Sequence, residues 1–181
     1  SRRNAMTLYR RWGAGPREGR VYGGFVRYAM GERRTELVRD LVSADRPHAL
    51  YLLDESNLKP YFGLSASARF ADWCRYKTSL CLPLRNDLSQ RFFDAWLTGQ
   101  IPLVPRELTP ALAFLGEEAL SRHVAVFEEY GVDAVHAAQE EALEKFDAGG
   151  QAGADERHHM AREHHMFSNR ISEIIDLVCA L

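Results

Sequence analysis

The sequence predicts an α/β domain of Rossmann-like, three-layer type, in which helices cover both faces of a parallel sheet of about five strands. Short apolar segments alternate along the chain with segments whose apolar residues recur at helical spacing, as in successive βαβ units. The segment TSLCLPL, residues 78–84, is apolar almost throughout, which is typical of a strand buried on both faces of a sheet. A chain of 181 residues has the length of one such domain.

The first half of the chain contributes two strands and two helices to this prediction. Residues 20–28 (RVYGGFVRY) and the apolar run at 49–53 have the composition of strands. Between them, residues 30–45 carry leucines and valines on one side of a helix. A second helix is expected over 65–76, where serines suited to capping precede an apolar face that includes Trp73.

The segment after the apolar strand is predicted to form a helix, a turn and another strand. Asp87 and Gln90, three positions apart, match a capping box, so a helix is expected over 88–98. Gly99 stands where glycine commonly ends a helix. The following IPLVP, residues 101–105, is expected to be the next strand, since proline is tolerated near the start of a strand.

The last third of the chain begins with a proline-punctuated loop and a strand at 123–130. An acidic helix is expected over 134–146, and a glycine-rich break (DAGGQAGAD) at 147–155 follows it. A final helix from about 156 to 178 completes the order of elements.

The N-terminal 20 residues are basic and short of apolar periodicity. We interpret residues 1–20 as a processed end or as the seam with a missing domain or partner chain, and residues 21–181 as the folded domain. A basic segment of this kind either holds phosphate or forms a solvated, partner-facing arm.

Composition excludes several classes of protein. Hydrophobic residues make up 46% of the chain and the net charge is −2, whereas a disordered chain combines low hydrophobicity with a large net charge. The near-neutral balance gives no reason to expect nucleic acid as a partner. No apolar run approaches the ~18 residues of a membrane span, and three cysteines without CxxC spacing are typical of a reducing compartment, so a cytoplasmic protein is expected.

The main candidate site lies at the start of the helix that follows the apolar strand. In open α/β sheets, ligands bind at the carboxyl ends of strands, and the free N–H groups of a helix N-terminus suit a phosphate there. The loop residues Asn86 and Asp87, the hydroxyl of Ser89 and the planar guanidinium of Arg91 occupy that place, and Asp94 follows one turn later. The same spacing also suits an exposed row of ion pairs, so the pattern alone leaves both interpretations open.

The stretch SQRFFDAWLTGQIPLV, residues 89–104, resembles a signature of exostosin-like and related nucleotide-sugar glycosyltransferases. Its matching positions are Ser89, Arg91, Asp94, Ala95, Gly99, Ile101, Pro102 and Val104. The tail HHMFSNRISEII is similar to the His-Thr-Tyr-x-x-Arg tail of spore-protein-like glycosyltransferases, through His165, Phe167 and Arg170. The sequence departs from the exostosin pattern at Gln100, where that family frequently has cysteine, and before Ser89, where it often has Gly-Asp.

The resemblance implies half of a GT-B fold, namely the C-terminal, nucleotide-sugar-binding domain of a glycosyltransferase. In such enzymes the serine and arginine meet the diphosphate and the acidic residue meets the ribose, which gives those roles to Ser89, Arg91 and Asp94. The donor would be a UDP- or GDP-linked sugar, bound as a substrate and not as a cofactor. The general base would come from an N-terminal domain or partner chain, so no catalytic residue is assigned in this chain. A eukaryotic exostosin-like protein would work in the Golgi lumen.

Two other functions fit the same pattern. The first is non-catalytic binding of a nucleotide or nucleotide sugar. The second is a flavodoxin-like interaction module that uses the acidic surface of residues 117–144. The second function predicts an acidic cluster at the strand ends and no affinity for nucleotides.

Gly23, Gly24 and Arg27 form a second candidate site. Two glycines after a strand let the backbone approach a ligand closely, and in Rossmann folds that place is the first strand–helix turn. There is no GxGxxG pattern, so an ordinary turn is the other interpretation.

The four histidines near the C-terminus are close in sequence but do not predict a metal site. None of them has the i, i+4 spacing of paired helical ligands; they are His158, His159, His164 and His165. Cys81 lies within the apolar strand, where a thiol is inert.

Overall fold

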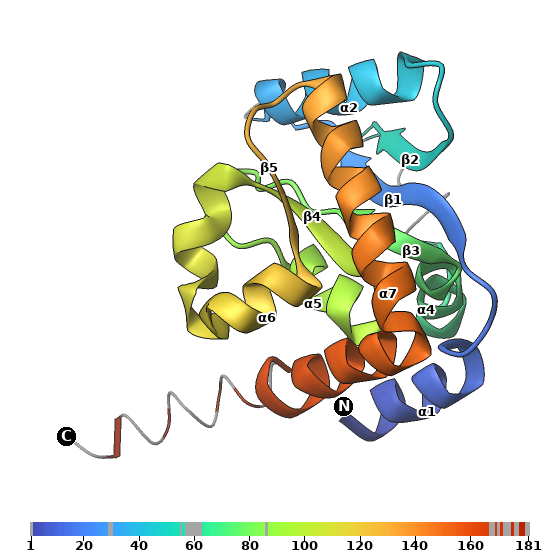
Figure 1. Ribbon diagram of the computed structural model, residues 1–181, viewed down its shortest axis with the longest axis vertical. Helices are drawn as coiled ribbons and strands as arrows, with labels where there is room; N and C mark the ends of the chain where they lie inside the picture. Colours follow the sequence, from blue (N-terminus) through green and yellow to red (C-terminus); the bar gives the residue numbers. More distant parts are fainter. Residues whose placement is uncertain are drawn as a thin grey trace.

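Parallel strands form one sheet in the computed structural model of the chain, in the order β2-β1-β3-β4-β5 (Figure 1). They are β1 (Glu18–Val26), β2 (His48–Leu53), β3 (Tyr76–Leu80), β4 (Ile101–Pro105) and β5 (Ala125–Phe127). The structure describes residues 2–28, 31–54, 56, 63–85 and 87–166, and the single positions 169, 171, 175, 178 and 179. The predicted parallel sheet and the Rossmann-like class are confirmed.

Strands β3 and β4 are neighbours, as predicted, with Thr78 opposite Ile101 in a parallel ladder. Strand β3 is shorter at its carboxyl end than the expected 78–84. The N–H of Cys81 still donates to β4, at 2.9 Å from the carbonyl of Leu103. Proline at position 83 then has no N–H to continue the ladder, so the chain leaves the sheet there.

Helices cover both faces of the sheet and make three layers (Figure 1). They are α1 (Arg2–Trp12), α2 (Glu32–Ser43), α4 (Ala66–Cys74), α5 (Gln90–Leu97), the 3₁₀ helix η1 (Arg106–Leu115), α6 (Gly116–His123) and α7 (Val132–His164). Alternate residues of β1 pack on the two faces of the sheet, because successive side chains of a strand point to opposite sides. Val21 and Phe25 belong to the core under α2 and α7, whereas Tyr22 packs on Trp73 of α4 with the ring centroids 5.1 Å apart.

The loop expected before β5 is in fact helical, and that expectation was wrong. Leu108 and Leu112, four residues apart, are buried on one side of η1. Pro110 lies inside the segment, and its missing N–H disfavours a regular α-helix. Pro110 therefore lies in a tight, irregular helix and not in an open loop.

The glycine-rich break expected at 147–155 is a kink within one long helix. Only Gly150 of α7 leaves helical geometry, at φ 53° and ψ −148°, a conformation that glycine adopts most readily. Beyond the kink, Arg157 and His158 donate to the carbonyls of Gly99 and Leu97, just before β4. The second half of α7 therefore crosses the amino end of the sheet, beside α1 (Figure 1).

The basic N-terminal segment contains a helix that packs on the domain. Ala5 and Tyr9, one turn apart, are buried. The ring of Tyr9 stacks on His158 at 3.9 Å, and its hydroxyl donates to Asp155 at 3.0 Å. Because β1 begins at Glu18, the sheet starts slightly before the expected boundary at residue 21.

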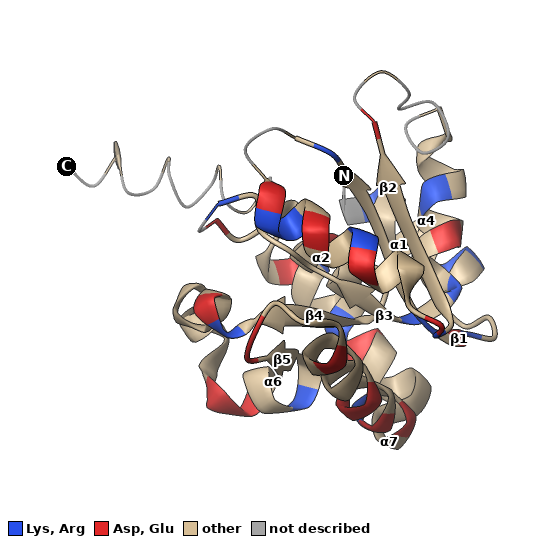
Figure 2. Cartoon of the chain, turned by 90° about the horizontal axis from the view of Figure 1, so that it is seen from above, with Lys and Arg blue, Asp and Glu red and all other residues tan. Residues whose placement is uncertain are grey.

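Residues of both charges occur on most of the helices (Figure 2). Exposed carboxylates gather on the first half of α7, at Asp133, Glu140, Glu141, Glu144 and Asp147. Among the helices of the described ranges, none has the length and apolar character needed to cross a membrane.

Candidate functional site

The order of the strands locates the place where a ligand is expected. After β1 the chain adds β2 on one side and then returns to add β3 on the other. The helices after β1 and β3 therefore diverge, and open α/β sheets bind ligands in the crevice this leaves at the carboxyl ends of the two strands. We call this place the β1/β3 crevice and define it by Phe25, Gly31, Arg34, Leu84 and Arg91.

Two guanidinium groups meet in the β1/β3 crevice. Arg34 of α2 and Arg91 of α5 lie 5.9 and 4.8 Å from the centre of the Phe25 ring. Cations over an aromatic face are attracted by its quadrupole, which positions both groups. The pKa of Arg34 is lowered by its burial and also by the positive charge of Arg91. The crevice therefore concentrates positive charge, which the nearby carboxylate of Asp87 offsets only in part.

Each of the two guanidinium groups keeps at least one nitrogen that forms no hydrogen bond with a described residue. Arg34 is only 5% exposed and donates from Nη2 to the carbonyl of Val26 at 2.8 Å, while its Nε has no partner. A buried donor without a partner is costly, so it marks a position where a ligand would be bound favourably. Arg91 donates no side-chain hydrogen bond to any described residue, and its fork of donors suits the oxygens of a phosphate.

The first turn of α2 adds backbone donors to the crevice. Gly31 is the residue before this helix, and no side chain caps its first N–H groups. A Cβ at Gly31 would lie 3.0 Å from Leu84 and 3.6 Å from Nε of Arg34. Glycine therefore lets the helix start approach the loop after β3 and the Arg34 guanidinium closely.

The start of α5 is capped differently from the prediction. The N-cap is Ser89, whose Oγ accepts from the N–H of Arg91 at 3.4 Å. Asp87 does not cap the helix with Gln90, because its Oδ1 accepts from the N–H of Arg85 at 3.0 Å and so closes the loop on itself. The expected capping box was therefore wrong, and Ser89 starts the helix and holds the backbone of Arg91 in its first turn.

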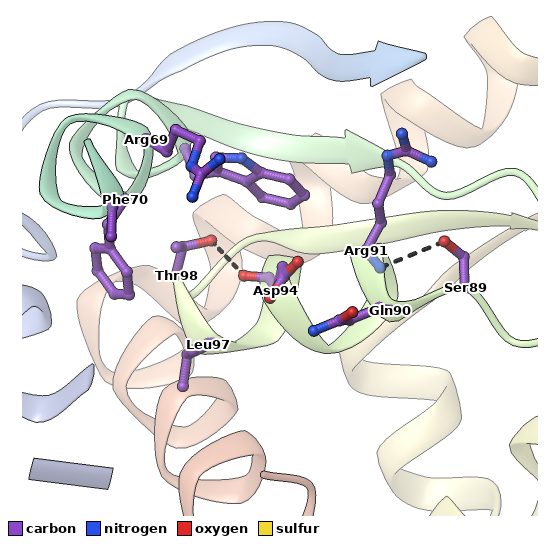
Figure 3. Close-up of a pocket in the computed structure, with 10 residues that line it drawn as sticks. Arg69, Phe70, Ser89, Gln90, Arg91, Asp94, Leu97 and Thr98 are labelled. Atoms are coloured by element: carbon purple, nitrogen blue, oxygen red, sulfur yellow. Dashed lines mark hydrogen bonds between the residues drawn. The ribbon is translucent and has the colours of Figure 1, made fainter. Parts of the chain in front are cut away.

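A larger cavity of about 510 Å³ lies beside the crevice, between α4 and α5. We call it the α4/α5 pocket; Arg69, Phe70 and Trp73 line it from α4, and Asp94 and Thr98 line it from α5 and its end (Figure 3). The Oγ1 of Thr98 donates to the backbone carbonyl of Asp94 and not to its carboxylate. The carboxylate itself accepts no hydrogen bond from any described residue.

Asp94 and Arg91 leave α5 in different directions. Figure 3 shows Arg91 extending toward the carboxyl end of β3, while Asp94 faces the pocket. Burial raises the pKa of Asp94 to about 6, against the opposing effects of Arg91 and Arg69. The first two turns of α5 therefore join a cationic crevice to a pocket that contains an available carboxylate.

The structure brings some of the predicted site residues together and separates others. Ser89, Arg91 and Asp94 share the start of α5, and Asp87 lies exposed in the loop before it. Asn86 lies outside the described residues, as do Phe167 and Arg170 of the tail.

The two glycines of the second candidate site lie within strand β1. Gly23 and Gly24 are paired within β1, opposite Leu50 and Tyr51 of β2, and not in the turn after the strand. A Cβ at Gly23 would meet the Phe25 ring at 2.7 Å, so this glycine makes room for that ring. Arg27 follows β1 with an exposed side chain.

Sequence analysis missed Gly31, Arg34 and Arg69. The glycine of the first strand–helix turn is Gly31, and Arg34 stands three residues after it in the first turn of α2. A glycine followed by an arginine at that distance, directly after the first strand, was the available signal. Arg69 carries no such signal, because only the packing of α4 beside α5 brings it near Asp94.

Two of the C-terminal histidines pack against aromatic rings, and Cys74 and Cys81 are buried. His158 is enclosed between Tyr9 and the end of α5, and His165 lies 5.3 Å from the ring of Phe93. Burial raises the pKa of Cys74 to about 11 and that of Cys81 to about 12, so both stay as unreactive thiols. Within the described residues, no group of histidine, cysteine and acidic side chains is arranged to hold a metal ion.

No known protein family matches the chain, and a search of curated protein sequences finds no significant match.

Proposed function

We propose that this domain binds the nucleoside-diphosphate sugar donor of a glycosyl transfer in the β1/β3 crevice. The observation that supports this most directly is the meeting of Arg34 and Arg91 over Phe25, with one buried donor unpartnered. A diphosphate carries at least two negative charges on adjacent groups, which matches two guanidiniums reaching the same place from two helices. The uncapped first turn of α2 supplies further donors to the same anion.

The nucleoside half of the donor would occupy the α4/α5 pocket. This cavity falls within the ~300–1,000 Å³ range of small-molecule sites and is lined by both aromatic and polar side chains. The carboxylate of Asp94 is available to accept hydrogen bonds from the two ribose hydroxyls. This is the role that the resemblance to exostosin-like enzymes gives to the same position.

The proposed reaction is the transfer of the sugar to an acceptor hydroxyl. The bond between C1 of the sugar and the phosphate oxygen breaks, and its electron pair leaves on the diphosphate. A bond forms between C1 and the acceptor oxygen, whose proton passes to a base outside this chain. Arg34 and Arg91 would stabilise the charge that grows on the leaving diphosphate, which is the main electrostatic contribution a donor domain makes.

The flavodoxin-like alternative is less well supported by the geometry. It predicts acidic side chains at the β1/β3 switch point, where Arg34 and Arg91 lie. The carboxylates of Glu107 and Glu128 are further along, after β4 and β5, and each is ion-paired with an arginine.

A thermal-shift screen with UDP, GDP, ADP and their sugars tests the proposal. A ligand present at 100 times its Kd stabilises the folded chain by about 2.7 kcal/mol, which should raise the Tm by roughly 5–10 °C. A shift with at least one nucleoside diphosphate is expected, together with none for the free monosaccharides. No shift with any nucleotide at millimolar concentration would contradict the proposal. Release of free nucleotide from the bound sugar donor, with and without acceptor, then separates a transferase from a binding module.

A further inference from the structure

A second, smaller cavity lies beside Arg34. It has a volume of about 180 Å³ and is lined by the first turn of α2, by the loop 83–85, and by Glu107 and Tyr130 after β4 and β5. We call it the α2/β4 pocket. Because Arg34 lines it and also lies against Phe25, the pocket opens directly beside the β1/β3 crevice.

Glu107 is held in a fixed position at this pocket. The hydroxyl of Tyr130 donates to Oε1 of Glu107 at 2.7 Å, and Nη1 of Arg33 lies 3.6 Å from Oε2. Arg33 also covers the Tyr130 ring, 3.8 Å from its centre. The pKa of Tyr130 is raised by burial and by this carboxylate, so the tyrosine stays protonated and continues to donate.

The held carboxylate keeps the capacity to bind a ligand. A carboxylate has about four acceptor positions, of which the hydrogen bond from Tyr130 uses one, while Arg33 is ion-paired at 3.6 Å. Glu107 remains 40% exposed, so water or a ligand reaches it. A side chain positioned by two neighbours and still accessible is suited to recognise a hydroxyl-bearing group.

The lining of the pocket favours a neutral polyhydroxyl ligand over an anion or an apolar group. Glu32 and Glu107 supply acceptors, while Arg33, Arg34 and Arg85 supply donors. Sugar hydroxyls both donate and accept, and so match a lining of both kinds. At about 180 Å³ the pocket lies below the ~300 Å³ at which drug-sized ligands fit, which suits a single ring.

We infer that the α2/β4 pocket holds the sugar group of the donor, with Glu107 accepting hydrogen bonds from its hydroxyls. This inference rests on the proposed function. The order of sites along the surface matches the order of groups in the donor: Asp94 for the nucleoside, Arg91 and Arg34 for the diphosphate, and Glu107 for the sugar. Tyr130 lines the pocket as well, and its hydroxyl orients Glu107 by donating to Oε1.

The test compares a nucleoside diphosphate with its sugar conjugate in matched variants. UDP with UDP-glucose, GDP with GDP-mannose, and ADP with ADP-glucose are titrated into the wild type, E107Q, Y130F and E128Q. Glu128 is the control, because it is an exposed carboxylate that is ion-paired with Arg106 next to the pocket but does not line it. Thermal melts of each variant check that the fold is kept.

The expected result is a selective loss. Glu107→Gln should weaken the sugar conjugate about tenfold or more, because a charge-assisted hydrogen bond is lost, and should leave the free diphosphate unchanged. Tyr130→Phe should give a smaller loss of the same kind, and Glu128→Gln should give none. Equal affinities for conjugate and diphosphate in the wild type, or an unchanged ratio in E107Q, would overturn the inference alone. A wild type that binds none of the diphosphates overturns the proposed function and this inference together.

Discussion

Two buried arginines, one at each end of the sheet, differ in what surrounds them. Arg34 at the carboxyl end and Arg157 at the amino end are 5% and 1% exposed, and each has one nitrogen without a partner. Arg157 donates to the carbonyl of Gly99 and to Nδ1 of His123, and so ties the second half of α7 to the turn before β4. Arg34 makes one backbone hydrogen bond and lines a cavity beside Arg91.

The difference shows how the same residue type serves stability at one end and binding at the other. At the amino end, Arg157 lies 5.3 Å from the centre of the Phe146 ring and is enclosed by helices. At the carboxyl end, diverging helices leave space, so the donors of Arg34 and Arg91 remain available. Changes at the amino end should therefore alter folding, and changes at the carboxyl end should alter ligand affinity.

The largest effect is expected from Arg157→Ala. It removes a fully buried side chain and leaves the Gly99 carbonyl without its donor, which should lower the free energy of unfolding by about 3–4 kcal/mol. Denaturant unfolding measures this, with Arg122→Ala on exposed α6 as the control. The nucleotide affinity of the folded Arg157→Ala variant should be unchanged. A large loss of affinity would show that the two ends of the sheet do not have separate roles.

The pH dependence of Asp94 should have opposite signs for folding and for binding. Because its pKa is raised from 3.8 to about 6, the folded chain holds this proton more tightly than the unfolded chain. Its contribution to stability is therefore complete below about pH 4 and is lost as the pH rises through about 6, on the order of 2–3 kcal/mol. Nucleotide affinity should change the other way, falling about tenfold per pH unit below pH 6, since ribose hydroxyls need the carboxylate as acceptor.

Asp94→Asn provides the control for both measurements. The asparagine variant should lose both pH dependences in melts and in titrations between pH 4.5 and 8. Persistence of either one in Asp94→Asn would assign it to another group.

A moderate loss of stability is expected from Gly99→Ala. Gly99 has φ 80°, and an added Cβ would lie 3.1 Å from both the carbonyl oxygen and the Cβ of Ala154 in α7. The strain and the crowding together should cost about 2 kcal/mol. Gly116→Ala is the matched control, because its φ is 76° but nothing lies within 4 Å of an added Cβ. Equal losses in the two variants would show that the packing of α7 on this turn contributes little.

A smaller effect on stability is expected from Ser89→Ala at the carboxyl end. Loss of the N-cap hydrogen bond to Arg91 should lower stability by about 1 kcal/mol. Because the cap also holds the backbone from which the Arg91 side chain extends, nucleotide affinity should fall by a few-fold. Ser65→Ala, which removes the cap of α4, is the control that changes stability alone.

The elements that depend on local pattern were predictable from the sequence. The strands, the cap at Ser65 and the helix end at Gly99 follow from apolar runs, serine and glycine. The helices over 106–123 were missed because Pro110 indicated a loop, although Leu108, Leu112 and Leu115 recur at helical spacing. Helix α7 continues through its glycines because it packs against the sheet and α5. This packing joins residues that are far apart in the chain, so no local sequence pattern predicts it.

The candidate site was only partly predictable for the same reason. Ser89, Arg91 and Asp94 lie on one helix, so their spacing was visible in the chain. Arg34 lies 57 positions before Arg91, and only the parallel pairing of β1 with β3 brings the two together. Glu107 and Tyr130 join Arg33 because β4 and β5 end at the same edge of the sheet.

The most direct test of the donor site is the nucleotide affinity of Arg91→Ala, measured by calorimetric titration of UDP and GDP beside denaturant melts. The account predicts a loss of about 30- to 150-fold in affinity, because a charge-assisted and bidentate contact to the diphosphate is removed. The free energy of unfolding should change by less than about 0.5 kcal/mol, since Arg91 is partly exposed and donates no side-chain hydrogen bond to any described residue. Unchanged affinity with a large loss of stability would show that Arg91 only packs on Phe25, and would contradict the account.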